Sequence, residues 1–166
     1  MNGETPGFRN GTAGVLIRPP RLYLGALLIA FIGDSIWPAA IPLVGDSAAP
    51  VLRIGIGIAL AAVGLATAVL AMRGFQRAGT PVPTPQPTTA LVTTGPYRYS
   101  RNPIYIGLTL LYAGIAIDAD NPWALVLLVP VLLVMRYGVI AREEVYLARK
   151  FGSGYESYRA RVRRWL

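Results

Sequence analysis

The sequence contains no cysteine and no histidine. The absence of cysteine excludes disulfides, thiolate nucleophiles and cysteine metal sites. The absence of histidine removes the commonest general base and the commonest metal ligand of proteins. Serine–histidine and cysteine–histidine catalysis are therefore excluded, and we expect no metal site.

Charged residues are also scarce. They make up 14% of the 166 residues, whereas 54% are hydrophobic; a soluble domain has roughly 25% charged residues. The apolar residues form four blocks, at about 22–44, 51–72, 103–117 and 123–140. Because a transmembrane helix needs about 20 mostly apolar residues, we predict an all-α integral membrane bundle of about four transmembrane helices.

The third and fourth blocks are joined by a short segment, Asp118–Pro122, which is a strong turn signal. Pro103 suits the first position of a helix. Two apolar helices joined by a short turn form an antiparallel pair. We therefore predict a helical hairpin over residues 103–140.

The second block carries small residues at a spacing that suits close packing of membrane helices. They are Gly55, Gly57, Ala61, Gly64 and Ala68. This face could serve packing within the chain or a dimer, so a homo-oligomer stays open.

The remaining segments are more polar. Residues 1–14 are polar and glycine-rich, without the apolar core of a cleavable signal peptide. We predict a disordered leader over residues 1–17 and a single domain over 18–166. Within that domain, residues 73–102 form a proline-rich cytoplasmic loop and residues 141–166 a cytoplasmic tail.

The net charge of +8 follows the predicted topology. Basic residues precede the first block, lie between the second and third, and follow the fourth, whereas the other connections are mainly acidic. Positive residues mark the cytoplasmic side of a membrane. We therefore expect both termini in the cytoplasm and a bacterial inner membrane as the location. The basic charge is explained by this topology and does not indicate nucleic-acid binding.

The predicted hairpin brings two polar segments together on the cytoplasmic side: Gly95–Tyr105 and Arg142–Glu144. Three tyrosines, Tyr97, Tyr99 and Tyr105, could be interfacial anchors or a wall for a planar ligand. The acidic pair that follows the fourth block lies near a predicted helix C-terminus, where it opposes the macrodipole. It is either a solvated helix end with arginine partners or a group that holds a ligand.

Resemblance to a known family rests on these motifs. The segments LVTTGPYRYSRNPIYIG and AREEVYLARKFGSGYESYRARVRRWL resemble the isoprenylcysteine carboxyl methyltransferase and phospholipid methyltransferase superfamily. The resemblance covers roughly residues 74–166. The matching residues are Arg101, Pro103, Tyr105, Gly107, Glu143, Glu144, Phe151, Gly152, Tyr155, Tyr158, Arg163 and Trp165.

The resemblance implies a membrane methyltransferase that binds S-adenosylmethionine from the cytoplasm and receives a lipophilic acceptor from the bilayer. Membrane lipids and this acceptor are the expected partners, and nucleic acid is not. The implied cofactor-binding residues are Tyr97, Arg98, Arg101, Asn102, Pro103, Tyr105, Gly107, Glu143 and Glu144. The implied catalytic residues are Arg101, Asn102 and Glu144.

One residue departs from the family pattern, because the prenylcysteine enzymes usually have histidine where this chain has Asn102. Asparagine donates and accepts hydrogen bonds but cannot titrate as a base. Of the charged residues inside apolar blocks, Arg136 could extend its charged end to the membrane interface or contact an acceptor head group. Asp34 suits a structural or interfacial role. The alternative functions are a nicotinamide-dependent membrane reductase of related fold and a non-catalytic membrane subunit.

Overall fold

The structure, a computed structural model, describes residues 13–41, 49–82 and 87–166. Within these ranges it is all-helical and contains no strand. The helices are α1 (Pro19–Ile36), α2 (Ala49–Arg77), the 3-10 turn η2 (Gly95–Arg98), α3 (Pro103–Asp118), α4 (Pro122–Val134), the π-helix η3 (Met135–Ile140), α5 (Ala141–Phe151) and α6 (Ser153–Arg161). The predicted fold class is therefore confirmed.

Two helical rods are long and apolar enough to cross a membrane, Pro50–Arg77 and Pro122–Phe151. The second comprises α4, η3 and α5 in succession and has 30 residues, or about 45 Å at 1.5 Å per residue. This exceeds the bilayer's hydrocarbon thickness of about 30 Å. The shorter helices α1 and α3 leave the predicted count of four spans unconfirmed.

The long rod corrects one expectation. Glu143 and Glu144 lie in the first turn of α5, and helix continues to Phe151. The pair is therefore not at a helix C-terminus, and the macrodipole argument against its position does not apply. Because η3 and α5 continue α4 without a break, the pair lies beyond the apolar residues of α4 along the same rod.

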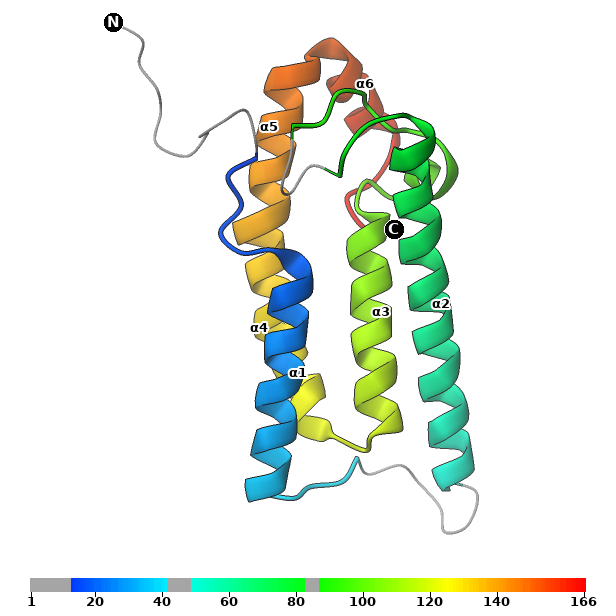
Figure 1. The fold of residues 1–166 in the computed structure, drawn as a ribbon, viewed down its shortest axis with the longest axis vertical. Helices are drawn as coiled ribbons and strands as arrows, with labels where there is room; N and C mark the ends of the chain where they lie inside the picture. Colours follow the sequence, from blue (N-terminus) through cyan, green and yellow to red (C-terminus); the bar gives the residue numbers. More distant parts are fainter. Residues whose placement is uncertain (1–12, 42–48, 83–86) are drawn as a thin grey trace, which may run out of the picture.

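Helices α2 and α3 approach closely over much of their length (Figure 1). A Cβ added at Gly64 would lie 2.5 Å from the Leu111 nitrogen, and one at Gly114 would lie 2.5 Å from the Ala61 nitrogen. Glycine is therefore required by the close approach of two backbones. The predicted small-residue face of α2 packs against α3 within the chain, except at Gly55, which has nothing within 4 Å.

The end of the molecule that carries the α3–α4 turn is held by polar contacts. Asn121 caps α4 by accepting a hydrogen bond from the Ala124 nitrogen at 3.0 Å, and it donates to the Ala30 carbonyl of α1 at 3.3 Å. Asp120 pairs with Arg53 of α2 at 3.2 Å. These bonds tie the hairpin turn to both neighbouring helices.

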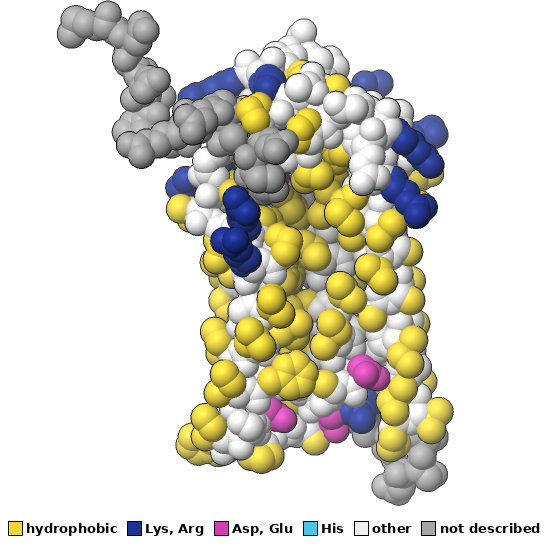
Figure 2. All heavy atoms as spheres, in the orientation of Figure 1, with side chains coloured by type: hydrophobic (Ala, Val, Ile, Leu, Met, Phe, Trp, Pro, Cys, Tyr) yellow, Lys and Arg dark blue, Asp and Glu magenta, His cyan; other side chains and the backbone are white. Residues whose placement is uncertain are grey.

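The opposite end is covered by α5, α6 and the segment between α2 and α3 (Figure 1). Lysine and arginine side chains gather around this end, whereas the acidic side chains in view lie near the other end (Figure 2). The predicted leader overlaps described residues 13–17, and these are hydrogen-bonded to the long rod. The Leu16 nitrogen donates to the Gly138 carbonyl at 3.3 Å, and Arg142 donates to the Gly14 carbonyl at 2.9 Å. The rest of the leader, residues 1–12, lies outside the described residues.

Candidate functional site

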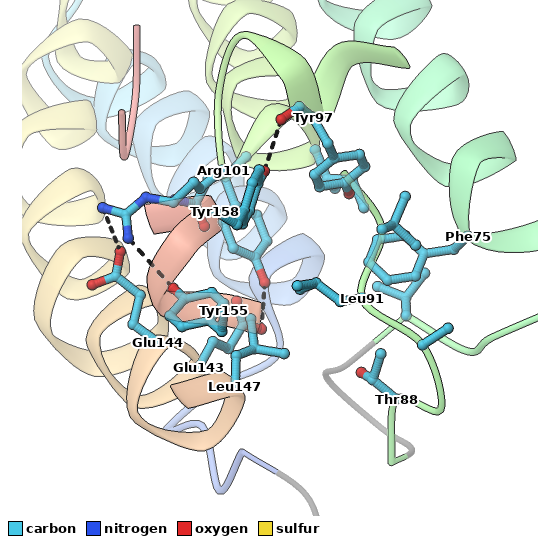
Figure 3. A pocket seen from close by; sticks show the side chains of 16 residues that line it. Phe75, Thr88, Leu91, Tyr97, Arg101, Glu143, Glu144, Leu147, Tyr155 and Tyr158 are labelled. Atoms are coloured by element: carbon cyan, nitrogen blue, oxygen red, sulfur yellow. Dashed lines mark hydrogen bonds and ion pairs between the residues drawn. The ribbon is translucent and has the colours of Figure 1, made fainter. Parts of the chain in front are cut away.

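A pocket lies at the covered end of the bundle, between α2, the segment before α3, α5 and α6 (Figure 3). Its cavity volume is about 60 Å³. The lining residues are Phe75, Val82, Thr88, Ala90, Leu91, Val92, Tyr97, Arg101, Asn102, Ile104, Tyr105, Glu143, Glu144, Leu147, Tyr155 and Tyr158. Residues from four separate parts of the sequence thus meet around one cavity.

Glu143 is a buried carboxylate on the α5 side of this pocket. Its side chain accepts a hydrogen bond from the Tyr105 hydroxyl at 2.7 Å, and both residues are buried. Tyr105 comes from the first turn of α3, so the bond joins the two helices. It is the only hydrogen bond to the Glu143 carboxylate from the described side chains, which leaves acceptor capacity for a ligand.

Glu144, the next residue, is held by two arginines. Arg101 Nη2 lies 3.1 Å from its Oε1, and Arg164 donates from Nε to the same oxygen at 3.0 Å. The side chains of Glu144 and Arg101 are each 10% exposed. The hydrogen bond from Arg164 to Glu144 raises the pKa of Arg164, so this guanidinium stays charged.

Two pairs of aromatic rings also line the pocket. The rings of Phe75 and Tyr97 meet edge to face with centroids 5.4 Å apart. Those of Tyr155 and Tyr158 meet in the same manner at 6.3 Å. The Tyr158 hydroxyl donates to the Tyr97 carbonyl at 2.8 Å, so α6 is bonded directly to η2.

The hydroxyls of these tyrosines stay protonated, and that of Tyr155 accepts a hydrogen bond from Arg101 Nη1 at 3.4 Å. Burial raises the pKa of Tyr97 and of Tyr158 above the usual tyrosine value. Burial and the neighbouring Glu144 carboxylate raise the pKa of Tyr155 as well. All three hydroxyls therefore remain protonated at physiological pH.

Two buried polar atoms that belong to pocket residues have no hydrogen-bond partner within the described structure. They are Thr88 Oγ1 and Arg101 Nε. An unpaired buried polar group costs about 1–3 kcal/mol. Their presence on the lining of one cavity indicates groups that a bound molecule could satisfy.

Asn102 holds the C-terminal segment against the start of α3. Its side-chain nitrogen donates to the Arg164 carbonyl at 2.8 Å, and Ser100 Oγ donates to the same carbonyl at 3.2 Å. The Arg101 nitrogen donates to the Arg163 carbonyl at 3.0 Å. The tail therefore lies beside residues 100–102, and its position brings Arg164 to Glu144.

Six of the nine expected cofactor-binding residues line this pocket: Tyr97, Arg101, Asn102, Tyr105, Glu143 and Glu144. The other three lie elsewhere. Arg98 is exposed, Pro103 is buried at the first position of α3, and Gly107 packs against α2, where an added Cβ would lie 2.6 Å from the Gly64 carbonyl oxygen.

Sequence reasoning did not assign several other lining residues to the site, among them Phe75, Thr88 and Leu147. Tyr155 and Tyr158 were part of the family motif, and their paired spacing was a usable signal. Thr88 follows a proline-rich segment, and nothing in its neighbours distinguishes it from a surface loop residue.

Comparison with known proteins identifies the family. The sequence model of the phospholipid methyltransferase family matches residues 52–154. The chain therefore belongs to this family, and the resemblance inferred from its motifs is confirmed. The matched region contains the Tyr105–Glu143 pair and Glu144 but stops before Tyr155. Family membership implies methyltransferase activity connected with lipids.

A relative from Haemophilus influenzae, described as an uncharacterized protein, is 38% identical over 63 residues. The similar region covers 38% of this chain and 100% of the relative. No solved structure matches the chain.

Proposed function

We propose that this protein is an S-adenosylmethionine-dependent methyltransferase that acts on a lipophilic acceptor at the cytoplasmic face of a bacterial inner membrane. The observation that carries the proposal is a single pocket, in a member of a methyltransferase family, lined by two buried carboxylates and two buried polar atoms without partners. Family membership alone supports the reaction class, and the pocket supports the cofactor.

The lining chemistry fits S-adenosylmethionine, which carries a carboxylate, an ammonium, ribose hydroxyls and an adenine ring. Glu143 would accept hydrogen bonds from hydroxyl or ammonium groups, and Arg101 Nε would donate to an anionic or carbonyl oxygen. Thr88 can donate or accept. The edge-to-face pair of Phe75 and Tyr97 offers an aromatic surface for adenine.

The pocket must widen to hold a ligand of this size. Its volume is about 60 Å³, whereas ligand sites usually measure about 300–1,000 Å³. Its walls come from elements that are far apart in the sequence, so these elements can move apart without changing the backbone conformation within each of them. We expect donor binding to displace the segment around Leu91 and Val92 from α5.

When bound, the cofactor supplies a methyl group activated by a sulfonium leaving group. The protein then has to align the acceptor and exclude water. Arg101 and Glu144 would fix the pocket's shape through their ion pair. If the methyl acceptor must lose a proton, Glu143 is the suitable base, because Glu144 is already paired with two arginines.

The charge distribution supports the proposed membrane face. Basic side chains surround the end that holds the pocket (Figure 2), and positive residues mark the cytoplasmic side. A water-soluble cofactor would then enter from the cytoplasm, and a lipophilic acceptor would enter from the bilayer.

The proposal is tested by calorimetric titration of the detergent-purified protein with S-adenosylhomocysteine, the demethylated product. Thr88→Val is the key variant, because it removes a buried hydroxyl without a partner and keeps the side chain's shape. Losing one ligand hydrogen bond should weaken binding by roughly 5–10-fold. Thr67→Val is the matched control, since the Thr67 hydroxyl bonds its own helix at the Val63 carbonyl.

Each outcome decides between the candidate functions. Binding that Thr88→Val weakens and Thr67→Val preserves supports a methyl donor in this pocket. If the folded protein does not bind S-adenosylhomocysteine but binds NADPH, the reductase alternative replaces the proposal. Binding of neither leaves the non-catalytic subunit.

A further inference from the structure

A second cavity lies between α3, the α4–η3 rod and the C-terminal residues. Its volume is about 380 Å³, which lies within the usual range for small-molecule sites. The lining residues are Ile106, Thr109, Leu110, Leu132, Leu133, Arg136, Trp165 and Leu166. We call this cavity the apolar groove, because most of these side chains are hydrophobic.

Arg136 is the charged residue of the apolar groove. The rod begins at Pro122, and Arg136 follows 14 positions later, which is about 21 Å along the helix. A charge within an apolar membrane segment costs about 2.5–3.5 kcal/mol on insertion scales. Such a residue needs a compensating partner or a route to water.

The described residues do not supply Arg136 with an anionic partner. Its guanidinium lies 5.5 Å from the centroid of the Tyr137 ring, and no carboxylate of the described chain forms an ion pair with it. Arg53 and Arg101, by contrast, pair with acidic side chains. Arg136 is exposed, and its donors are available at the groove.

The hydroxyl of Thr109, which also lines the groove, is already engaged. The Thr109 hydroxyl donates to the Tyr105 carbonyl at 2.8 Å. Its oxygen, Oγ1, also lies 2.7 Å from the hydroxyl oxygen of Tyr23. Arg136 is the charged side chain among the lining residues, so the attraction of an anionic group to the groove depends on Arg136. This arginine also belongs to the π-helix η3, and short π-helical segments occur frequently at functional sites.

The C-terminal residues connect the groove with the pocket. Trp165 and Leu166 line the groove, while Arg164 binds Glu144, which lines the pocket. The groove reaches the first turn of α3, because its lining residue Ile106 directly follows Tyr105, which bonds Glu143. The two cavities thus share the tail and neighbouring turns of α3.

We propose that the apolar groove binds the methyl acceptor, and that this acceptor is a single-chain lipophile with an anionic head group held by Arg136. The lining takes the chain, the volume suits one chain, and a guanidinium binds anionic oxygens through charge-assisted hydrogen bonds. The acceptor role rests on the proposed function, whereas binding of the lipophile in the groove can be measured without it.

The test uses Trp165 as a reporter within the groove. The chain has three tryptophans, so Trp37 and Trp123 are replaced by phenylalanine in the full-length protein, which is placed in phosphatidylcholine nanodiscs. Quenching of Trp165 fluorescence is titrated with 9,10-dibromostearate and with the neutral 9,10-dibromostearyl alcohol. Arg136→Gln, Arg136→Lys and Arg142→Gln are compared. Arg142 is the matched control, because it bonds the Gly14 carbonyl instead of lining the groove.

We expect saturable quenching by dibromostearate, weakened about tenfold or more by Arg136→Gln, partly retained by Arg136→Lys and unchanged by Arg142→Gln. The affinity of the alcohol should be the same for the protein with Arg136 as for the Arg136→Gln variant. Equal quenching by acid and alcohol in all variants would overturn the proposed role of Arg136. Quenching by dibrominated phosphatidylcholine that stearate does not displace would overturn the single-chain anionic occupant.

S-adenosylhomocysteine titration of the same variants separates the two proposals. Lipophile binding without cofactor binding would retain the groove as a ligand site and refute the methyltransferase function. Cofactor binding without charge-selective lipophile binding would refute the groove assignment alone.

Discussion

At the residue scale, Glu144 and Asn102 connect the C-terminal segment to the pocket. The Glu144 carboxylate accepts a hydrogen bond from the Arg164 side chain, and the Asn102 side chain donates one to the Arg164 backbone carbonyl. Arg101 pairs with Glu144 from the segment before α3. The geometry of the pocket thus depends on one carboxylate that joins two arginines from separate elements.

We predict that Glu144→Gln strongly destabilises the protein. The substitution leaves the largely buried Arg101 without its counter-charge, and breaking a buried pair on one side costs about 3–5 kcal/mol. Because the Arg164 side chain is 28% exposed, we expect a loss at the lower end of this range, about 3 kcal/mol. Thermal unfolding in detergent, followed by intrinsic fluorescence, measures the change.

Glu156→Gln is the matched control for this prediction. Glu156 also pairs with an arginine, Arg159, at 3.8 Å, but the two side chains are 56% and 50% exposed. Such surface pairs contribute about 0–1 kcal/mol. Equal losses in the two variants would contradict a specific role for the buried network.

At the element scale, α2 and α3 can pack closely because glycines at their contact carry no side chain. Gly57, Gly64, Gly107 and Gly114 place backbone against backbone, with an added Cβ meeting atoms at 2.5–2.8 Å. This contact fixes the start of α3, and hence Tyr105, relative to Phe75 at the end of α2. Gly107 belongs to the packing that supports the pocket rather than to its lining.

We predict that Gly64→Ala destabilises the protein by about 1–3 kcal/mol, because the added methyl meets α3 backbone that cannot rotate away. Gly55→Ala on the same helix is the control. Nothing lies within 4 Å of a Cβ at Gly55, and alanine improves a helix by up to about 1 kcal/mol over glycine. Comparison of their melting temperatures checks the prediction, which a neutral Gly64→Ala would contradict.

At the scale of the whole molecule, the charges indicate an orientation. The end with the pocket is basic, and the opposite end holds Asp118 and Asp120 beside Arg53. The expected arrangement places the Arg98 region in the cytoplasm and the α3–α4 turn on the other side. This requires α3 to cross the membrane, although it has only 16 residues.

The absence of cysteine makes this orientation directly testable. We predict that a cysteine replacing exposed Arg98 reacts with a membrane-impermeant maleimide only in inside-out vesicles. A cysteine replacing exposed Ala119 should react only in right-side-out vesicles. Labelling of both positions from the same side would show that α3 does not span the bilayer, and would refute the four-span topology.

Much of the fold followed from local sequence signals. Apolar blocks and turn residues predicted the helices and the 103–140 hairpin, because the position of an apolar helix depends mainly on hydrophobicity along the chain. The boundaries were less accurate: the expected loop from residue 73 overlaps α2, which ends at Arg77. The tail predicted over 141–166 contains α5 and α6, since its polar residues are still good helix formers.

The candidate site was predictable where residues belonged to a recognised motif. Tyr105 and Glu143 were expected in one site, and they are joined by a 2.7 Å hydrogen bond. Thr88 and Phe75 could not be assigned in this way. Their places on the pocket depend on how the segment between α2 and α3 folds back, which no local pattern specifies.

The sequence by itself determined the class of this protein: a helical membrane protein without histidine or cysteine chemistry, with motifs of a methyltransferase family. These properties follow from composition and from spacing along the chain. Only the tertiary structure decided which polar groups share the pocket, that Gly107 packs against α2, and that Arg136 faces an apolar groove. The reason is that burial and pairing depend on contacts between helices that are distant in sequence.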